Sequence, residues 1–549
     1  MKVMRWLDEH FEECLMFAAL WLVVLFSTLQ IIMRYVFRNS LPWPEEINRY
    51  LFIWFAYLGL SYAVRHSCHT RIDIFETLIP KLKKPFSVIC DLGMLFFCAY
   101  MIAPGCRVVQ SLYVTGQTSS AMNLPMYFVY AGLLVGIPIG VAVGATAITC
   151  VLLDPALPVT TDYVFRTLVT ALDSTTLLAV PLFILSGNLM AKGGISERLF
   201  DFFAYFVGER TAGMPIAAIV TCLFYGAISG SGPATVAAVG AMTIPILVRL
   251  GYDKRFVVGM IATAGGLGVI IPPSLPFIMY GVSSGESVGD MFLAGVVPGV
   301  LIALIMSIYT FFFCKKKGED KEKLRANAQA LRARGLWAIF KEGFWALLTP
   351  VIILGGIYSG VVTPTEAATI SVVYALIISL FVYKSMKLRD LVPITEASIR
   401  SCAPIQLIVA AAVCFGRILT MLQIPQTIAV ALTTTFTSKI ALLLVINLFL
   451  LIVGMMMETL AAILILTPIF LPVVTAIGMD PIHFGVMMVV NLAIGFVTPP
   501  VGVNLYVASN MTNTSVLNVA RHAVPYILMF LVALMLITFI PAISLVFLK

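Results

Sequence analysis

The chain has 549 residues, of which 60% are hydrophobic and 11% are charged, and its mean hydropathy is +1.01. This composition excludes an ordinary soluble protein, and the long apolar runs exclude a β-barrel, so we predict an all-α polytopic membrane protein. The net charge of +8 does not indicate nucleic-acid binding, because residues 315–341 hold nine Lys or Arg against three acidic residues, as a cytoplasmic loop does.

The first part of the chain is predicted to contain three spans, at Cys14–Met33, Tyr50–Val64 and Phe86–Ala103. Basic residues before the first span and after the second place these ends in the cytoplasm. Arg34 and Arg38 then fall on the outer side, against the positive-inside rule.

The next apolar run, Pro125–Val151, is too short for the crossings it should make. The loops on both sides of it look external, so two crossings of roughly 20 residues each are needed. The run has only 27 residues. We therefore predict that a natural connection is missing at Ala131–Gly132, which divides the chain into a first domain, 1–131, and a second domain, 132–549. One unbroken helix through Ala131–Gly132 would count against this prediction.

The second domain is expected to begin with spans at Gly132–Leu152 and Thr175–Met190 and an interfacial helix at Glu197–Val207. Residues 213–250 then hold two apolar segments separated by Ser229-Gly230-Ser231-Gly232-Pro233, with basic residues at both outer ends. This pattern predicts a re-entrant helical hairpin that opens to the cytoplasm. The following span, Val257–Ile271, is predicted to break at Pro272-Pro273.

Four further spans are expected at Met291–Phe313, Phe344–Val362, Glu366–Tyr383 and Cys402–Leu422, with a second interfacial arm at Leu388–Arg400. A second hairpin at about 440–477 has Met457-Glu458 at its tip. No basic residue follows this hairpin until Arg521, so it is expected to open outward. A second broken span at Phe484–Val507 and a last span at Val524–Leu545 complete the chain.

The two hairpins and their broken spans are related by an ungapped shift of 227 positions, from Ser231 to Glu458. The shift superposes Pro245 on Pro472, Gly251 on Gly478, Asp253 on Asp480, Gly268 on Gly495, and Pro272-Pro273 on Pro499-Pro500. Matched Gly/Pro-interrupted segments of opposite orientation are typical of transporters built from inverted repeats, whose binding sites lie at the breaks.

The breaks supply the groups that a monovalent cation and an anionic substrate need: bare carbonyls, small hydroxyls and half-helix ends. The alternative is that these Gly and Pro residues only allow close helix packing. The predicted ion-binding residues are Ser229, Gly230, Ser231, Gly265, Gly268, Pro272, Gly454, Glu458, Thr459, Gly495, Thr498 and Pro499. The predicted substrate-binding residues are Ser186, Asn188, Ser274 and Asn504.

Some of these positions have a structural alternative. Glu458 is a carboxylate at membrane depth, which is costly and therefore functional by default, unless it is solvated at the hairpin mouth. Polar packing is the alternative for Ser186 and Asn188. Asp253 and Asp480 are expected to cap the helices that follow them. Arg417, inside the Cys402–Leu422 span, either contacts a substrate anion or snorkels from the scaffold.

Several motifs resemble the membrane component of tripartite ATP-independent periplasmic (TRAP) transporters, with the small and large subunits fused. The large-subunit motifs are Leu185-Ser186-Gly187-Asn188-Leu189-Met190 with Gly193-Gly194, Ser229-Gly230-Ser231, Ile270-Ile271-Pro272-Pro273-Ser274, Thr363-Pro364-Thr365-Glu366-Ala367, and Phe496-Val497-Thr498-Pro499-Pro500-Val501-Gly502. Weaker small-subunit motifs are Trp43-Pro44-Glu45-Glu46 and His69 with Ile72-Asp73.

The resemblance implies an elevator-type secondary transporter in the bacterial inner membrane, in which two hairpins and two broken helices move together, with sodium held at each hairpin tip. It implies a periplasmic binding protein that delivers a small organic acid of the sialic acid, C4-dicarboxylate or sulfonate class. The permease would be a monomer or a homodimer in membrane lipid, with no cofactor besides sodium as coupling ion. Fused members usually have a connecting helix and a complete fourth small-domain span, and both are short here.

Other readings remain open at this point. An ion-coupled carboxylate permease without a binding protein would share the hairpins but would not need residues 1–131. An intramembrane enzyme would need paired carboxylates or a metal cluster, whereas the hairpin tips carry Ser231 and Glu458. The chain has no GxxxxGK[ST] sequence, so ATP hydrolysis is not expected.

Overall fold

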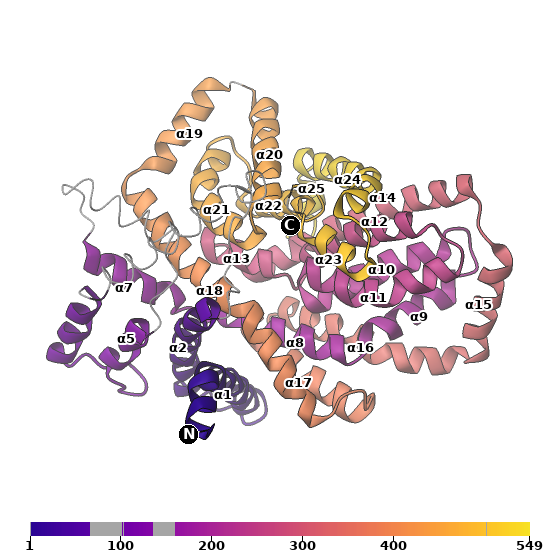
Figure 1. The fold of residues 1–549 in the computed structure, drawn as a ribbon. Helices are drawn as coiled ribbons and strands as arrows, with labels where there is room; N and C mark the ends of the chain where they lie inside the picture. Colours follow the sequence, from indigo (N-terminus) through magenta and orange to yellow (C-terminus); the bar gives the residue numbers. More distant parts are fainter. Residues whose placement is uncertain are drawn as a thin grey trace.

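The computed structural model describes residues 2–65, 102, 104–135, 160–436, 438–500 and 502–548. The described residues form helices joined by loops, and no strand occurs among them (Figure 1). Nine of the described helices are long and apolar enough to cross a membrane. This agrees with the predicted all-α polytopic fold. The third predicted span at Phe86–Ala103 and most of Gly132–Leu152 lie outside the described residues.

The first domain contains α1 (Lys2–Tyr35), α2 (Trp43–Arg65) and α5 (Met126–Val135). Glu46 of the Trp43-Pro44-Glu45-Glu46 motif is 3% exposed. Its Oε2 accepts hydrogen bonds from the Ala121 and Met122 N–H groups at 2.9 and 2.8 Å, and its Oε1 accepts one from the Tyr50 hydroxyl at 2.8 Å. The motif therefore closes the first domain by tying α2 to the loop before α5.

The point at which a connection is predicted to be missing, Ala131–Gly132, lies within helix α5. Helix α5 runs from Met126 to Val135 without interruption, which counts against a missing connection at that point. An apolar run of this kind forms one helix because nothing in it interrupts the backbone hydrogen bonds. The rest of the run, from residue 136 to Val151, lies outside the described residues.

Six helices surround the repeats: α7 (Thr161–Leu172), α8 (Ala179–Lys192), α9 (Ile195–Val207), α16 (Leu336–Tyr358), α17 (Pro364–Ile377) and α18 (Leu391–Met421). Helix α18 corrects the expected arm at Leu388–Arg400, because the arm and the span form one helix. Two of its polar residues are bonded to other helices: Thr395 accepts from the Trp21 indole at 3.1 Å and Ser398 from the Asn188 amide at 2.8 Å. Helix α19 (Ile424–Thr435) follows and was not predicted.

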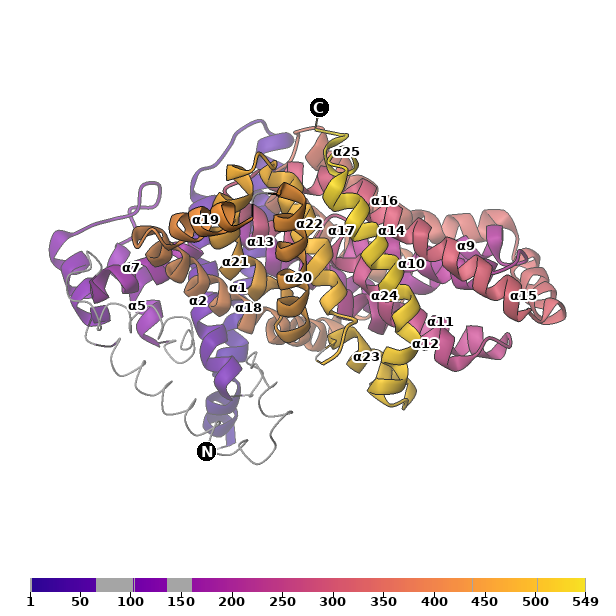
Figure 2. The same ribbon diagram turned by 90° about the horizontal axis from the view of Figure 1, so that it is seen from above.

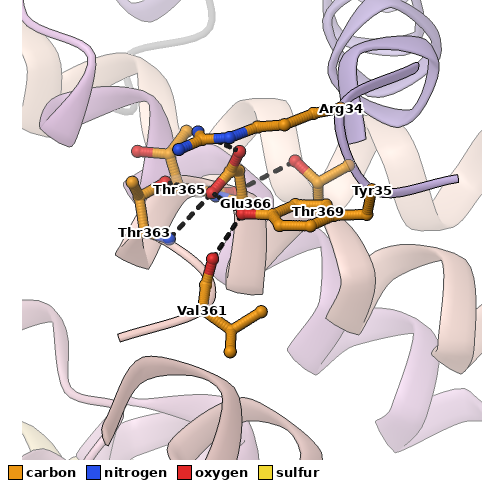
Figure 3. Close-up of polar contacts among 7 residues, drawn as sticks. All are labelled: Arg34, Tyr35, Val361, Thr363, Thr365, Glu366 and Thr369. Atoms are coloured by element: carbon orange, nitrogen blue, oxygen red, sulfur yellow. Dashed lines mark hydrogen bonds and ion pairs between the residues drawn. The ribbon is translucent and has the colours of Figure 1, made fainter. Parts of the chain in front are cut away.

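Helix α1 of the first domain and helix α17 meet at a polar cluster, shown in Figure 3. Arg34 and Tyr35 at the end of α1 reach the first turn of α17, where Thr363 and Glu366 form a capping box. The Glu366 Oε2 accepts from the Thr363 N–H at 2.8 Å and the Tyr35 hydroxyl at 3.3 Å, and Tyr35 also donates to the Val361 carbonyl. The Thr363–Ala367 motif is thus the junction between the two domains.

Each repeat is a pair of helices followed by a broken helix. The first has α10 (Gly213–Ser229) and α11 (Gly232–Arg249), then α12 (Lys254–Ala264), the 3₁₀ turn η3 (Gly265–Val269) and α13 (Leu275–Ser284). The second has α20 (Lys439–Met456), α21 (Thr459–Ala476), α22 (Pro481–Gly495) and α23 (Val503–Thr512). Both breaks contain a cis peptide bond, at Pro272–Pro273 and Pro499–Pro500.

The remaining helices either follow the first repeat and lead to α16 or end the chain. Helix α14 (Val288–Lys317) leads through α15 (Lys321–Ala333) to α16, and α24 (Val516–Phe539) and α25 (Ala542–Leu545) end the chain. Helix α24, which follows the second repeat in the sequence, packs along α12 of the first repeat and along α14; Figure 2 shows α24 beside α14. Chain-distant segments therefore form one unit around the breaks.

Candidate functional site

The first tip is a two-residue break between α10 and α11. Gly230 adopts φ +60°, the left-handed conformation that ends many helices, and its N–H bonds to the Gly226 carbonyl at 2.8 Å. Ser231 is extended, and Pro233 fits the first turn of α11, where no N–H is needed. The tip is packed against protein, because a Cβ on Gly230 would lie 3.2 Å from the Pro273 carbonyl oxygen.

Hydroxyl groups gather at this tip. The Ser229 and Thr235 hydroxyl oxygens are 3.0 Å apart, and Thr235 donates to the Ser231 carbonyl at 2.8 Å. Thr235 is fully buried and Ser229 is 4% exposed. Thr235 was missed in the sequence, although it lies one helical turn after Ser231 and so shares its face.

The glycines of the broken helix let its backbone reach this tip. A Cβ on Gly268 would lie 2.4 Å from the Thr235 hydroxyl and 2.8 Å from the Ser231 carbonyl oxygen. A Cβ on Gly226 would lie 2.6 Å from the Gly268 Cα. No side chain fits in these spaces, so the backbone of η3 contacts α10 and α11 directly. Ser274, which is 1% exposed, donates its hydroxyl to the Val269 carbonyl within the break, and Pro272 is buried beside it.

The second repeat contributes Asn504 to the first tip. This side chain is fully buried on α23, and its amide N–H bonds to the Ala262 carbonyl at 3.1 Å. A Cβ on Gly232 would lie 3.3 Å from both Asn504 Oδ1 and the Gly265 carbonyl oxygen. Asn504 Oδ1 has no hydrogen-bond partner among the described residues. Buried amide oxygens are almost always paired, and an orphaned one near a backbone carbonyl fits a cation ligand.

The second tip differs, because its acidic residue acts as a helix cap. Glu458 Oε2 accepts hydrogen bonds from the Leu460 and Ala461 N–H groups at 3.0 and 3.1 Å at the start of α21. Thr459 next to it is buried. The capping accounts for one carboxylate oxygen without any ion.

Close glycine contact recurs at the second tip. A Cβ on Gly495 would lie 2.1 Å from the Gly454 carbonyl oxygen, so α22 and α20 touch through their backbones. Thr498 donates to the Ile494 carbonyl at 2.7 Å and is half-buried, whereas Pro499 is exposed. The break after α22 is therefore more open than the one after η3.

Ser186 and Asn188 form hydrogen bonds with residues of α17 and α18. The Ser186 and Ser371 hydroxyls are 2.5 Å apart, and Asn188 donates to Ser398. Only Gly187 between them reaches the first tip, since a Cβ there would lie 3.2 Å from the Ser229 Cα. Arg417 is exposed on α18.

The two capping predictions are confirmed. Asp480 accepts from the Ile482 and His483 N–H groups at 2.9 and 3.1 Å, and Asp253 accepts from the Arg255 N–H at 2.8 Å. Burial raises the pKa of Asp253, but its bonds from Lys317 and the Arg255 N–H outweigh this and hold the pKa below its ordinary value.

The sequence matches two family models, which overlap and together cover residues 23–543. Residues 23–154 match the family described as "Tripartite ATP-independent periplasmic transporters, DctQ component", and residues 126–543 match "Tripartite ATP-independent periplasmic transporter, DctM component". The predicted domain boundary at 131–132 lies inside the overlap of the two ranges.

Curated relatives of both the fused and the separate kind are similar to this chain. The isethionate TRAP transporter permease protein of Oleidesulfovibrio alaskensis is 36% identical over 99% of this chain and 95% of its own length. The sialic acid TRAP transporter permease protein of Haemophilus influenzae is 30% identical over 94% of each chain. The C4-dicarboxylate TRAP transporter large permease protein of Pseudomonas aeruginosa is 45% identical over 67% of this chain and 85% of its own.

These matches cover both domains and the whole repeat. They exclude the enzyme alternative, because the family and the relatives are transport permeases. The chain belongs to the tripartite ATP-independent periplasmic (TRAP) transporters and is a multi-pass inner-membrane permease in which the DctQ and DctM components are fused.

Proposed function

We propose that this permease takes up a small organic acid by sodium-coupled secondary transport, after delivery by a periplasmic binding protein. The observation that carries the sodium part is the buried oxygen cluster at the first tip, where Asn504 Oδ1 has no partner among the described residues. The Gly265 carbonyl lies beside it across Gly232. The Ser229 and Thr235 hydroxyls and the Ser231 carbonyl belong to the same tip. Hydroxyl, carbonyl and amide oxygens at half-helix ends suit a hard cation such as sodium.

The second sodium site is proposed at the backbone of Gly454 and Gly495 and the side chains of Thr459 and Thr498. Glu458 is given the role of helix cap, because its Oε2 already accepts two N–H groups. This changes the ion-binding role that its sequence position suggests.

The helix pairs are proposed to be re-entrant hairpins that move as an elevator unit. Two complete spans would meet at a loop in water, whereas Ser229 is buried against Gly187 and Gly230 against Pro273. Unpaired backbone at membrane depth is tolerated only where protein or a cavity surrounds it. Helices α8 and α18 contact the moving unit and would form part of the fixed scaffold with the first domain.

The substrate is proposed to be an anion of the sulfonate, C4-dicarboxylate or sialic acid class, which are the compounds named for the relatives. The full-length isethionate relative makes a short sulfonate the first compound to test. Asn504 is proposed to bind the ion rather than the substrate, and Ser274 is proposed to hold the shape of the break. A stand-alone permease remains the second candidate, since α20–α23 would work in the same way without a binding protein.

Sodium binding can be tested without transport. A ligand that binds only the folded protein stabilises it by about 1.4 kcal/mol at ten times its Kd. The purified permease should therefore unfold at a higher temperature in NaCl than in KCl of equal ionic strength. Equal unfolding temperatures in the two salts over the full concentration range would contradict sodium coupling.

A further inference from the structure

A groove of about 660 Å³ opens where the end of α9, the start of α10 and the beginning of α15 meet. Figure 2 shows α15 beside α9 at the edge of the molecule, away from the two breaks. Its cations are Arg210, Lys321 and Arg325, and all three are exposed. We infer that this groove binds the headgroup of an anionic phospholipid from the cytoplasmic leaflet.

Charge pairing is the first step toward this inference. The neighbouring cations are matched: Lys323 with Asp320 at 2.9 Å, Lys317 with Asp253 at 3.0 Å, and Arg332 with Glu209 at 2.7 Å. Within the described ranges, no carboxylate is paired with Arg210, Lys321 or Arg325. Because Glu209 is paired with Arg332, the groove holds three cations against one remaining carboxylate, Glu319, and it is net positive.

The two acidic residues that line the groove are already engaged. Glu209 pairs with Arg332. Glu319 accepts the Ala212 N–H with both oxygens at 3.0 Å and the Tyr252 hydroxyl at 2.6 Å. Glu319 thus ties the start of α10 to the loop after α11 through hydrogen bonds from neutral donors, which hold its carboxylate against the helix pair but leave its charge in place.

The groove also has an apolar wall at the right depth. Phe311, which is 38% exposed, lies one turn before the Lys315–Lys317 end of α14, and Ile216 lies in the first turn of α10. Phe311 and Ile216 therefore lie about one helical turn, roughly 5 Å, toward the hydrocarbon from the polar ends of their own helices. Trp337, 76% exposed at the start of α16, is typical of the membrane interface.

A phospholipid matches both features, because it combines a phosphate with acyl chains. Basic pockets between membrane helices on the cytoplasmic side are suited to anionic headgroups, and the net charge of +6 over residues 315–341 places this loop on that side. A lipid in the groove would contact α9, α10 and α15 together. The inference does not depend on the proposed sodium coupling.

Native mass spectrometry of the full chain, equilibrated with phosphatidylethanolamine vesicles containing phosphatidylglycerol, tests the site. The groove variant is Arg210→Gln with Lys321→Gln and Arg325→Gln. The matched control, Lys315→Gln with Lys316→Gln and Lys341→Gln, removes the same charge from exposed residues that do not line the groove. Each cation near a membrane surface contributes about a fivefold factor to anionic-lipid binding.

Relative to the wild type, we expect the groove variant to retain roughly 100-fold less phosphatidylglycerol, and we expect the control to retain clearly more than the groove variant. Equal retention in both variants would mean that the loop attracts lipid only through its overall charge, and it would overturn the inference. Displacement of the lipid by millimolar inorganic phosphate would also overturn it, because the groove would then be a soluble-anion site. Unchanged melting temperatures confirm that both variants fold.

Discussion

Arg34 Nη1 lies 3.1 Å from Glu366 Oε1, so the end of the first helix forms an ion pair with the first turn of α17 (Figure 3). The Glu366 side chain is 10% exposed and the Arg34 side chain 46%. The ion pair neutralises the charge of Arg34, which the sequence predicts on the outer side against the positive-inside rule, with a residue of the second domain. A family motif thus has a structural role at the domain junction.

Replacing Glu366 by Ala should destabilise the permease strongly. The change removes the ion pair with Arg34 and the capping box with Thr363, which together are expected to cost roughly 2–4 kcal/mol. Chemical denaturation in mixed micelles measures the loss. Lys323→Gln is the control, because its pair with Asp320 is a surface ion pair worth less than about 1 kcal/mol. Equal losses in the two variants would contradict the junction role.

Gly268→Ala should abolish uptake. The added methyl group would lie 2.4 Å from the Thr235 hydroxyl and 2.8 Å from the Ser231 carbonyl oxygen, so the cluster at the first tip has to open. Gly355→Ala is the control, since a Cβ there meets nothing within 4 Å in helix α16. Initial uptake rates into proteoliposomes compare the two; wild-type rates for Gly268→Ala would show that the close approach is not needed.

Asn504→Ala should weaken sodium binding at the first tip by tenfold or more, because it removes the orphaned Oδ1. The expected result is a matching rise in the sodium concentration for half-maximal uptake. Asn510→Ala is the control on the same helix, where the side chain is exposed. If both variants keep the wild-type sodium dependence, Asn504 does not bind the ion.

Glu458→Gln should be tolerated, within about twofold in sodium dependence, because an amide oxygen can still accept the Leu460 and Ala461 N–H groups. Glu458→Ala should lower stability by about 1 kcal/mol through loss of the cap. A tenfold rise in half-saturating sodium for the Gln variant would instead assign the carboxylate to the ion.

A disulfide between Gly416→Cys on α18 and Pro468→Cys on α21 should stop an elevator movement. A Cβ on Gly416 would lie 3.6 Å from the Pro468 Cβ, which is within disulfide range. In a chain otherwise free of cysteine, oxidation should abolish uptake and reduction should restore it. Full uptake by the oxidised, cross-linked protein would contradict relative movement of these helices.

The repeat could be predicted from sequence because Gly and Pro at fixed spacing act through the local backbone. The break at Ser229–Pro233 and the caps at Asp253 and Asp480 follow from residues within a few positions. Asn504 could be singled out as polar in an apolar run, but its place at the first tip depends on how α23 packs against α11 and α12.

Other features could not be predicted because distant partners decide them. Helix α18 was divided in the sequence at polar residues that Trp21 and Asn188 satisfy in the fold. In the sequence Thr235 is an ordinary helix residue, and its role depends on the contact with Gly268 that the fold creates. Glu366 acts at the domain junction by pairing with Arg34, which lies 332 positions earlier in the sequence.

Uptake into proteoliposomes under an inward sodium gradient, with and without the cognate binding protein, tests the central claim most directly. Labelled isethionate, C4-dicarboxylates and sialic acid are the first substrates. We predict uptake of one of them only when sodium and the binding protein are both present. Uptake with sodium alone would make the protein a stand-alone permease, and uptake driven by a pH gradient without sodium would contradict the proposed coupling.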